Sequence, residues 1–347
     1  MLCDRIVDWR SHYRQEMSDG WTALFDVAGA KITRGVRFNL SDELIPILVD
    51  LARDRPQRVL DALAFARVPH QTTWIEYPFA PLRRYYDSLG FGSDGRTNTG
   101  DPVRIGMLIE ADVDRPDSFL THIAYDQPGQ PPVLAAAAIR FDGAKSIQSG
   151  HIAKYVRESW HAPASYTAQH PPSEANVEAT VAYCRHFSFE RAPLWSVMRQ
   201  EMFQRREEGA EERIFEAGAK DAASEIGLLI ATLIMMNTIN GIRVADADVS
   251  QLNRSRAKSG KPPLLGYSTA HFRLSRSEQK AIGSFGGGTT KAWHICRGHF
   301  KQRKKADGSV SLIWWREHWR GDQSRLRIKP PIIRVTGPAT MTHIEHG

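Results

Sequence analysis

The chain has few cysteines, no long apolar run and no recognisable metal-binding spacing. Its 347 residues include only Cys3, Cys184 and Cys296, an odd and widely separated set that argues against a disulfide framework and for a reducing compartment. The longest apolar run, 227–236, is about ten residues, roughly half of what a membrane span needs. Charges occupy the first ten residues, where a signal peptide would be apolar. We therefore expect a cytoplasmic protein that has no contact with a membrane.

Metal and nucleotide-loop signatures are also missing. Neither Cys-x-x-Cys nor His-Glu-x-x-His occurs, and alternation along a strand would separate His299 from His294 and Cys296. Glu76 and the acids within 110–117 would suit a two-metal nuclease, but the turn-like sequence over 112–117 favours solvated loop acids. The glycine-rich stretch 284–290 lacks the spacing of a phosphate loop and is expected to be a flexible connection. We expect no metal and no cofactor.

Acidic residues are scarce in one long segment. Of the 46 Lys and Arg residues, 19 lie between Gln251 and Arg334, together with only four of the 39 acids, so this segment carries a net charge of +15 and the rest of the chain −8. Such asymmetry predicts a polyanion as partner of the basic segment, although a basic surface kept for solubility is the simpler alternative.

The pattern of apolar residues predicts an α+β fold. Helical spacing from Leu44 to Leu51 predicts a helix with Ser41 as its N-cap, and Pro56 is expected to begin a second helix. The basic stretch 251–263 has no apolar period and is expected to be a loop or arm. Strands are predicted over 72–77, 103–109, 121–125, 133–141, 242–244 and 264–274.

Composition suggests a division into three parts and a tail. We expect an acidic to neutral α+β portion over 1–145, a helical middle over 146–250 with a buried helix at 222–237, a basic β-rich portion over 251–334 with a hairpin at 292–320, and a tail over 335–347.

The hairpin is the most informative local feature. Asp307-Gly308 between alternating apolar residues predicts a two-residue type I′ turn, because Asp and Gly tolerate the positive φ that this turn requires. This turn would pair Ala306 with Ser309, Phe300 with Trp315, Cys296 with Trp319, Arg297 with His318, and His299 with Arg316.

That register assigns the side chains to two faces, since successive residues of a strand point to opposite sides. The expected core face holds Cys296, Phe300, Ile313, Trp315 and Trp319. The expected cationic face holds Arg297, His299, Lys301, Arg316, His318 and Arg320, with Trp293 and Trp314 positioned to stack on bases.

The leading functional hypothesis is binding of nucleic acid, or of a nucleotide-like polyanion, on the cationic face. The predicted phosphate-binding residues are Arg297, Lys301, Arg303, Arg316 and Arg320, and the predicted accessory contacts are Arg254, Arg256, Lys258, Lys261, Trp293 and Trp314.

Two alternatives are open. His299 and His318 could act as general base and general acid in a metal-independent nuclease or phosphodiesterase, with the arginines holding the phosphate. The basic segment could instead engage an acidic host protein.

Two short motifs carry a resemblance. Arg297-Gly298-His299 and Trp315-x-x-His318-x-Arg320-Gly321, together with scattered patches over most of the chain, resemble an uncharacterised group of phage and prophage proteins. The resemblance implies no activity. It implies a protein that works in a bacterial cell during phage replication, packaging or counter-defence.

Overall fold

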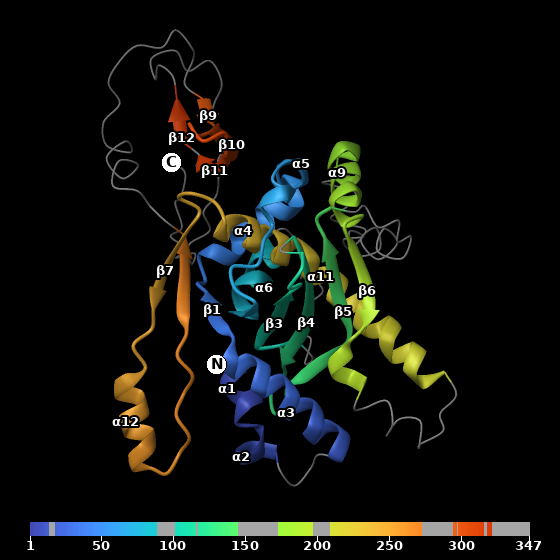
Figure 1. Cartoon of the computed structure of the whole chain (residues 1–347), viewed down its shortest axis with the longest axis vertical. Helices are drawn as coiled ribbons and strands as arrows, with labels where there is room; N and C mark the ends of the chain where they lie inside the picture. Colours follow the sequence, from blue (N-terminus) through green and yellow to red (C-terminus); the bar gives the residue numbers. More distant parts are fainter. Residues whose placement is uncertain are drawn as a thin grey trace, which may run out of the picture. The chain divides into compact units, whose positions relative to one another are not determined.

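The computed structural model describes residues 1–13, 18–88, 101–115, 117–144, 173–196, 209–272, 294–296, 298–315 and 318–320. The chain divides into two compact units, Met1–Ser275 with Phe300–Trp314, and Arg276–His299 with Trp315–Gly347. The first unit is built on one large sheet, and the chain is an α+β protein as predicted (Figure 1). In the second unit the short strands β9 (His294–Cys296) and β12 (His318–Arg320) pair antiparallel.

Eight strands of the described residues form the large sheet, in the order β6-β5-β4-β3-β2-β1-β8-β7. β1 pairs parallel with β2 and β8, and the other neighbouring pairs are antiparallel. The strands are β1 (Val36–Leu40), β2 (Thr72–Pro78), β3 (Arg104–Ala111), β4 (Ser118–Asp126), β5 (Val133–Asp142), β6 (Phe187–Arg191), β7 (Ile242–Asp246) and β8 (Ser268–Phe272).

Helices cover both faces of this sheet, so the central strand β4 is buried along nearly its whole length. The helices of the described residues are α1 (Leu2–Val7), α2 (Trp9–Tyr13), α3 (Asp19–Arg34), α4 (Leu44–Asp54), α5 (Pro56–Asp61), α6 (Phe79–Ser88), α9 (Glu174–Cys184), α11 (Ala210–Met236) and α12 (Ser250–Lys258), with short 3-10 turns at Leu63–Phe65 and Pro193–Trp195.

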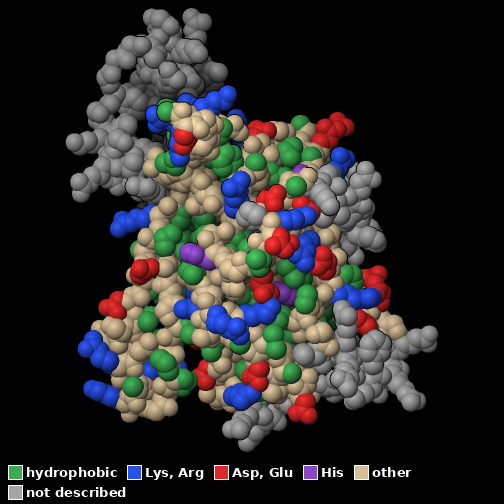
Figure 2. Space-filling view, viewed as in Figure 1, with side chains coloured by type: hydrophobic (Ala, Val, Ile, Leu, Met, Phe, Trp, Pro, Cys, Tyr) green, Lys and Arg blue, Asp and Glu red, His purple; other side chains and the backbone are tan. Residues whose placement is uncertain are grey.

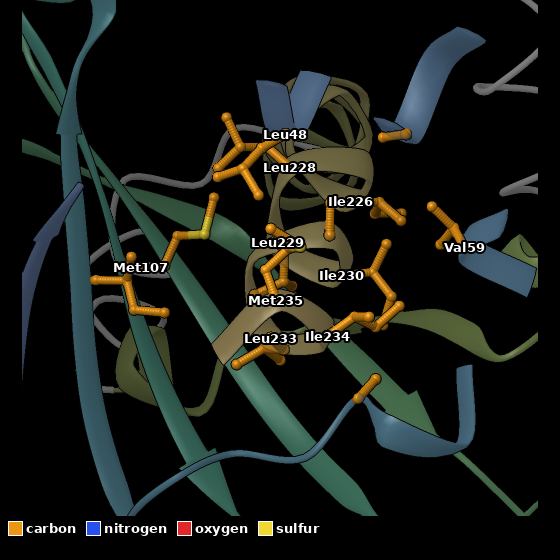
Figure 3. Packing of buried hydrophobic residues seen from close by; sticks show 14 of the residues in the cluster. Leu48, Val59, Met107, Ile226, Leu228, Leu229, Ile230, Leu233, Ile234 and Met235 are labelled. Atoms are coloured by element: carbon orange, nitrogen blue, oxygen red, sulfur yellow. The ribbon is translucent and has the colours of Figure 1, made fainter. Parts of the chain in front are cut away.

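The main core lies between the sheet and α11. From Glu225 to Met235 this helix is buried on nearly all sides, because β5 packs against one side and α4 against another. Figure 3 shows α11 between the sheet, from which Met107 approaches, and the helical layer that supplies Leu48 and Val59. A helix that is apolar all round is stable in water only when it is enclosed in this way.

A second core lies on the other face, under α1 and α3. Trp74 on β2 packs there with Leu24, Phe25 and Leu108. The indole fits because the neighbouring strand has glycine at position 106, where a Cβ atom would lie 2.3 Å from the Trp74 ring. A side chain at this position would therefore displace the tryptophan.

Glu76 attaches the N-terminal helix to the sheet. Its carboxylate accepts hydrogen bonds from the backbone N–H groups of Leu2 (3.0 Å) and Cys3 (2.9 Å), from the Trp74 indole (2.8 Å) and from the Arg104 guanidinium (2.7 Å). A carboxylate at the first turn of a helix also suits the positive end of the helix dipole. This buried charge is therefore compensated on every side.

Most of the predicted elements are present. The strands expected over 72–77, 103–109, 121–125, 133–141 and 242–244 are β2, β3, β4, β5 and β7, and β8 lies within 264–274. The predicted helix 222–237 is the C-terminal half of α11, which begins earlier, at Ala210. The prediction for Ser41 was wrong, because α4 begins at Leu44 with Glu43 in the N-cap position and no side-chain cap.

The large sheet takes strands from all three predicted parts, so the predicted boundaries at 145 and 250 do not separate different sheets. β1 to β5 come from the first predicted part, β6 and β7 from the second, and β8 from the third. β8 inserts between β1 and β7, so residues more than 200 positions apart in the sequence become neighbours. Composition could not reveal this, because strand pairing depends on neighbours that are distant in sequence.

Among the described helices, none has the length and apolar character needed to cross a membrane.

A buried carboxyl on α11 makes stability depend on pH. Glu225 is 5% exposed and accepts a hydrogen bond from the Tyr77 hydroxyl. Burial raises the pKa of Glu225 from 4.5 to about 6. The folded protein therefore binds this proton more tightly than the unfolded chain does. The resulting stabilisation of the fold is complete below pH 4.5 and is lost as the pH rises through 6. We expect the free energy of unfolding of the Glu225→Gln variant to exceed that of the wild type by about 2 kcal/mol at pH 8. At pH 4.5 the two proteins should differ little.

Urea denaturation of both proteins at the two pH values measures this difference. The exposed Glu216 on the same helix provides the control, since Glu216→Gln should change stability equally at both pH values. An equal gain for Glu225→Gln at the two pH values would show that burial does not govern this carboxyl.

Candidate functional site

The hairpin predicted near the C-terminal end exists, but its turn differs from the prediction. β10 (His299–Lys304) and β11 (Val310–Trp315) are joined by a loop in which the N–H of Gly308 donates to the Lys305 carbonyl (3.0 Å) and the N–H of Lys305 donates to the Ser309 carbonyl (2.8 Å). Gly308 has φ +80°, whereas Asp307 is outside the positive-φ region. A type I′ turn needs positive φ at both positions, so that prediction was wrong.

The observed loop contains three residues, Ala306 to Gly308, with the glycine in the left-handed position of a bulge. Asp307 favours this form because its carboxylate accepts hydrogen bonds from the N–H (2.9 Å) and the hydroxyl (2.6 Å) of Ser309. The same hydrogen bonds lower the pKa of Asp307.

One extra loop residue shifts the register of the hairpin by one position. Lys305 is opposite Ser309, Phe300 is in edge-on ring contact with Trp314 at 4.8 Å, and the rings of His299 and Trp315 lie 6.4 Å apart. The β9/β12 pair has the same offset, since the backbone of His318 pairs with Cys296 instead of Arg297. The predicted register was therefore wrong along both pairs of strands.

A shift of one residue exchanges the two faces of a strand. Trp314 is 5% exposed and packs in the main core with Leu312, whereas Trp315 is 43% exposed. The sequence had predicted the reverse, with Trp315 in the core and Trp314 available for bases. Trp314 is thus removed from the candidate contacts.

The chain segment that follows α11 holds the hairpin in place. The N–H of Ile239 donates to the Leu312 carbonyl (2.9 Å), and the N–H of Trp314 donates to the Ile239 carbonyl (3.2 Å). Backbone hydrogen bonds and two buried side chains therefore attach β11 to the core. β10 is the outer strand of the hairpin, because β11 has Ile239 on its other side.

Positive charge is concentrated on the part of the hairpin that faces solvent. Lys301 and Arg303 point away from the core, and Lys304 and Lys305 precede the turn, all four exposed. Within the described part of the chain, the side chains of Arg303, Lys304 and Lys305 make no ion pair. The single acid of 298–315 is Asp307, which is engaged by Ser309. Figure 2 shows Lys and Arg side chains around this end of the hairpin, in the upper part of the view.

The two histidines proposed for acid and base catalysis lose their geometric support. His299 is partly buried, and its ring contacts that of Trp315 from the neighbouring strand. The two imidazoles would share a face only in the predicted register, in which His318 pairs with Arg297. The observed pairing of His318 with Cys296 excludes that register. The side chains of His318 and Arg320 lie outside the described residues, as do Trp293, Arg297 and Arg316 entirely.

The second basic region, predicted to be a loop or arm, is mostly helical. α12 spans Ser250–Lys258 and connects β7 to the segment that leads into β8. The Asn253 amide group bonds to both backbone groups of Leu264, and the Arg256 guanidinium donates to the Pro262 carbonyl at 2.6 Å. These hydrogen bonds join α12 to the segment that follows it. The absence of an apolar period in 251–263 therefore did not mean an absence of regular structure.

Three cations of α12 and the segment that follows it are exposed. Arg254, Lys258 and Lys261 face solvent, whereas Arg256 is partly buried by its bond to Pro262. Three of the four residues predicted in this region are therefore accessible to a ligand.

Sequence reasoning missed one polar cluster on the sheet. The Lys31 ammonium binds both carboxylate oxygens of Glu110 at 2.7 and 2.8 Å, and the imidazole of His122 lies 3.6 Å from the same carboxylate. These neighbours lower the pKa of Glu110 to about 2, while burial lowers the pKa of His122. The three residues come from α3, β3 and β4, and no local spacing reveals them.

This cluster contains only two side chains that commonly bind metals. No group of three or more His, Cys, Asp or Glu residues suited to a metal ion is found among the described residues. Glu76, considered with the acids of 110–117 for a two-metal site, is instead engaged with α1 and Arg104.

Comparison of the chain with protein-family models, with curated proteins and with solved structures gives no match.

The register makes a testable distinction between adjacent tryptophans. We expect Trp314→Ala to lower the free energy of unfolding by about 3–5 kcal/mol, because it removes a buried aromatic side chain from the core. Trp315→Ala should cost less than about 1 kcal/mol, since that side chain is largely exposed. Urea denaturation of the two variants measures the costs. A larger cost for Trp315→Ala would support the type I′ register instead.

Proposed function

We propose that this protein binds nucleic acid through the cations at the solvent-facing end of the hairpin. The observation that carries the proposal is the set of four exposed cations, Lys301, Arg303, Lys304 and Lys305, on a hairpin whose other face is fixed in the core. In the same stretch the only carboxylate already bonds to Ser309.

Phosphate binding by such a surface has a clear physical basis. Each phosphate neutralised by Lys or Arg releases counterions from the nucleic acid, which favours binding at low salt. Because β11 is attached to the core, fewer degrees of freedom are lost when the ligand binds. The exposed cations of α12 provide a second region of the same charge.

The phage and prophage proteins that the chain resembles suggest where such binding would occur. We propose that the ligand is an RNA or DNA strand in a bacterial cell that carries a phage. Catalysis is not part of the proposal, because the observed register removes the argument for a His299 and His318 pair.

The hairpin cations can be tested directly. The triple variant Arg303→Gln, Lys304→Gln and Lys305→Gln should bind short labelled single strands of RNA and DNA more weakly than the wild type. If each residue contacts one phosphate, the slope of log K against log salt should become shallower by about 2. Fluorescence anisotropy over a series of salt concentrations measures both quantities.

A second triple variant, Arg34→Gln, Arg185→Gln and Lys220→Gln, removes the same charge from exposed positions on or beside α3, α9 and α11. It should leave the slope nearly unchanged. Equal losses in the two triple variants would show that net charge alone drives binding. No binding of either strand at low salt would overturn the proposal, and equal affinity for polyglutamate would favour an acidic protein as partner.

A further inference from the structure

A hollow of about 390 Å³ lies between α5 and the core-facing side of the hairpin. Arg58 and Asp61 of α5 line one side, and Phe300, Gln302 and Leu312 of the hairpin line the other. Its size is within the range of sites for small organic groups. All five residues belong to the first compact unit.

The apolar part of the lining is held firmly. Leu312 is 2% exposed, and Phe300 is partly buried and packs edge-on against Trp314 at 4.8 Å with an interplanar angle of 62°. Both residues extend the main core to the surface of the hollow. An aromatic ring fixed in this way provides a surface for a second flat ring without further loss of side-chain freedom.

The polar part of the lining is available for hydrogen bonding. Arg58 and Gln302 are exposed, and their side chains make no hydrogen bond or ion pair within the described residues. One carboxylate oxygen of Asp61 accepts a hydrogen bond from the Gln57 amide at 2.8 Å. The hollow thus combines a guanidinium, an amide and a carboxylate around an apolar wall.

We propose that this hollow receives one unpaired nucleobase, an inference that rests on the proposed function. Phe300 would stack on the base, while Gln302, Arg58 and Asp61 would hydrogen-bond to its edge. Recognition of single-stranded nucleic acid depends on this combination of aromatic stacking and edge hydrogen bonds. A paired base is buried in its own stack and cannot enter.

The position of the hollow on β10 links it to the phosphate-binding surface. Phe300 and Gln302 alternate along this strand with Lys301 and Arg303, so one strand presents base-binding residues to one side and cations to the other. Because β10 is the outer strand, a nucleic-acid strand that crosses it would bring a base to the hollow and its phosphates to the cations. The pair of surfaces therefore selects single strands.

The test compares three labelled probes of equal length: a single strand, its duplex, and a strand with abasic sugars. Wild-type protein should bind the single strand about 10-fold more tightly than the abasic strand, a ratio within the range for one stacked base, and more tightly than the duplex. The double variant Phe300→Leu and Gln302→Ala should lose this preference while binding the abasic strand as before. Phe300→Leu keeps an apolar side chain packed against the core. The midpoint of urea denaturation then shows whether the double variant is folded as stably as the wild type.

Matched changes outside the hollow, Phe65→Leu and Gln127→Ala, should preserve the preference. Equal wild-type affinity for the single and abasic strands would overturn the nucleobase site and leave the phosphate surface intact. An unchanged preference in the double variant would also overturn it. Failure to bind any of the three probes would overturn the proposed function as well.

Discussion

The enclosure of α11 is the constraint on which the rest of the structure depends. An apolar helix of this length must be covered on most sides, and the sheet, α4 and α5 provide that cover. The same core also includes Leu312 and Trp314 of the hairpin, and Ile239, just beyond the end of α11, bonds to β11 through its backbone. The candidate binding surface is therefore an extension of the core, and its orientation follows from the packing of α11.

Within the hairpin, a single residue in the loop decides which side chains reach solvent. The sequence correctly indicated a turn at Asp307-Gly308 and a strand on each side. It did not distinguish a two-residue loop from a three-residue loop, because Asp-Gly suits both and the difference depends on the φ angle of Asp307 and its bonds to Ser309. Lys301 and Arg303 kept their predicted exposure, whereas Trp314 and Trp315 exchanged places.

The polar groups buried in the sheet show a different limit of sequence reasoning. Glu76 accepts hydrogen bonds from α1, which begins more than 70 positions earlier, and Glu225 is bonded to Tyr77 across the core. Burial of a carboxylate is tolerated where hydrogen bonds replace its lost hydration. The residue type alone cannot show whether such partners exist, since they come from distant parts of the chain.

By itself, the sequence determined the α+β class, the positions of most strands, the apolar helix within α11 and the concentration of charge after Gln251, because these follow from local periodicity and composition. Only the tertiary structure decided that β8 lies between β1 and β7, that the basic arm is the helix α12, and that Phe300 and Gln302 meet Arg58 and Asp61 around a hollow. Such features depend on contacts between distant segments, and a pattern with a period of a few residues carries no information about them.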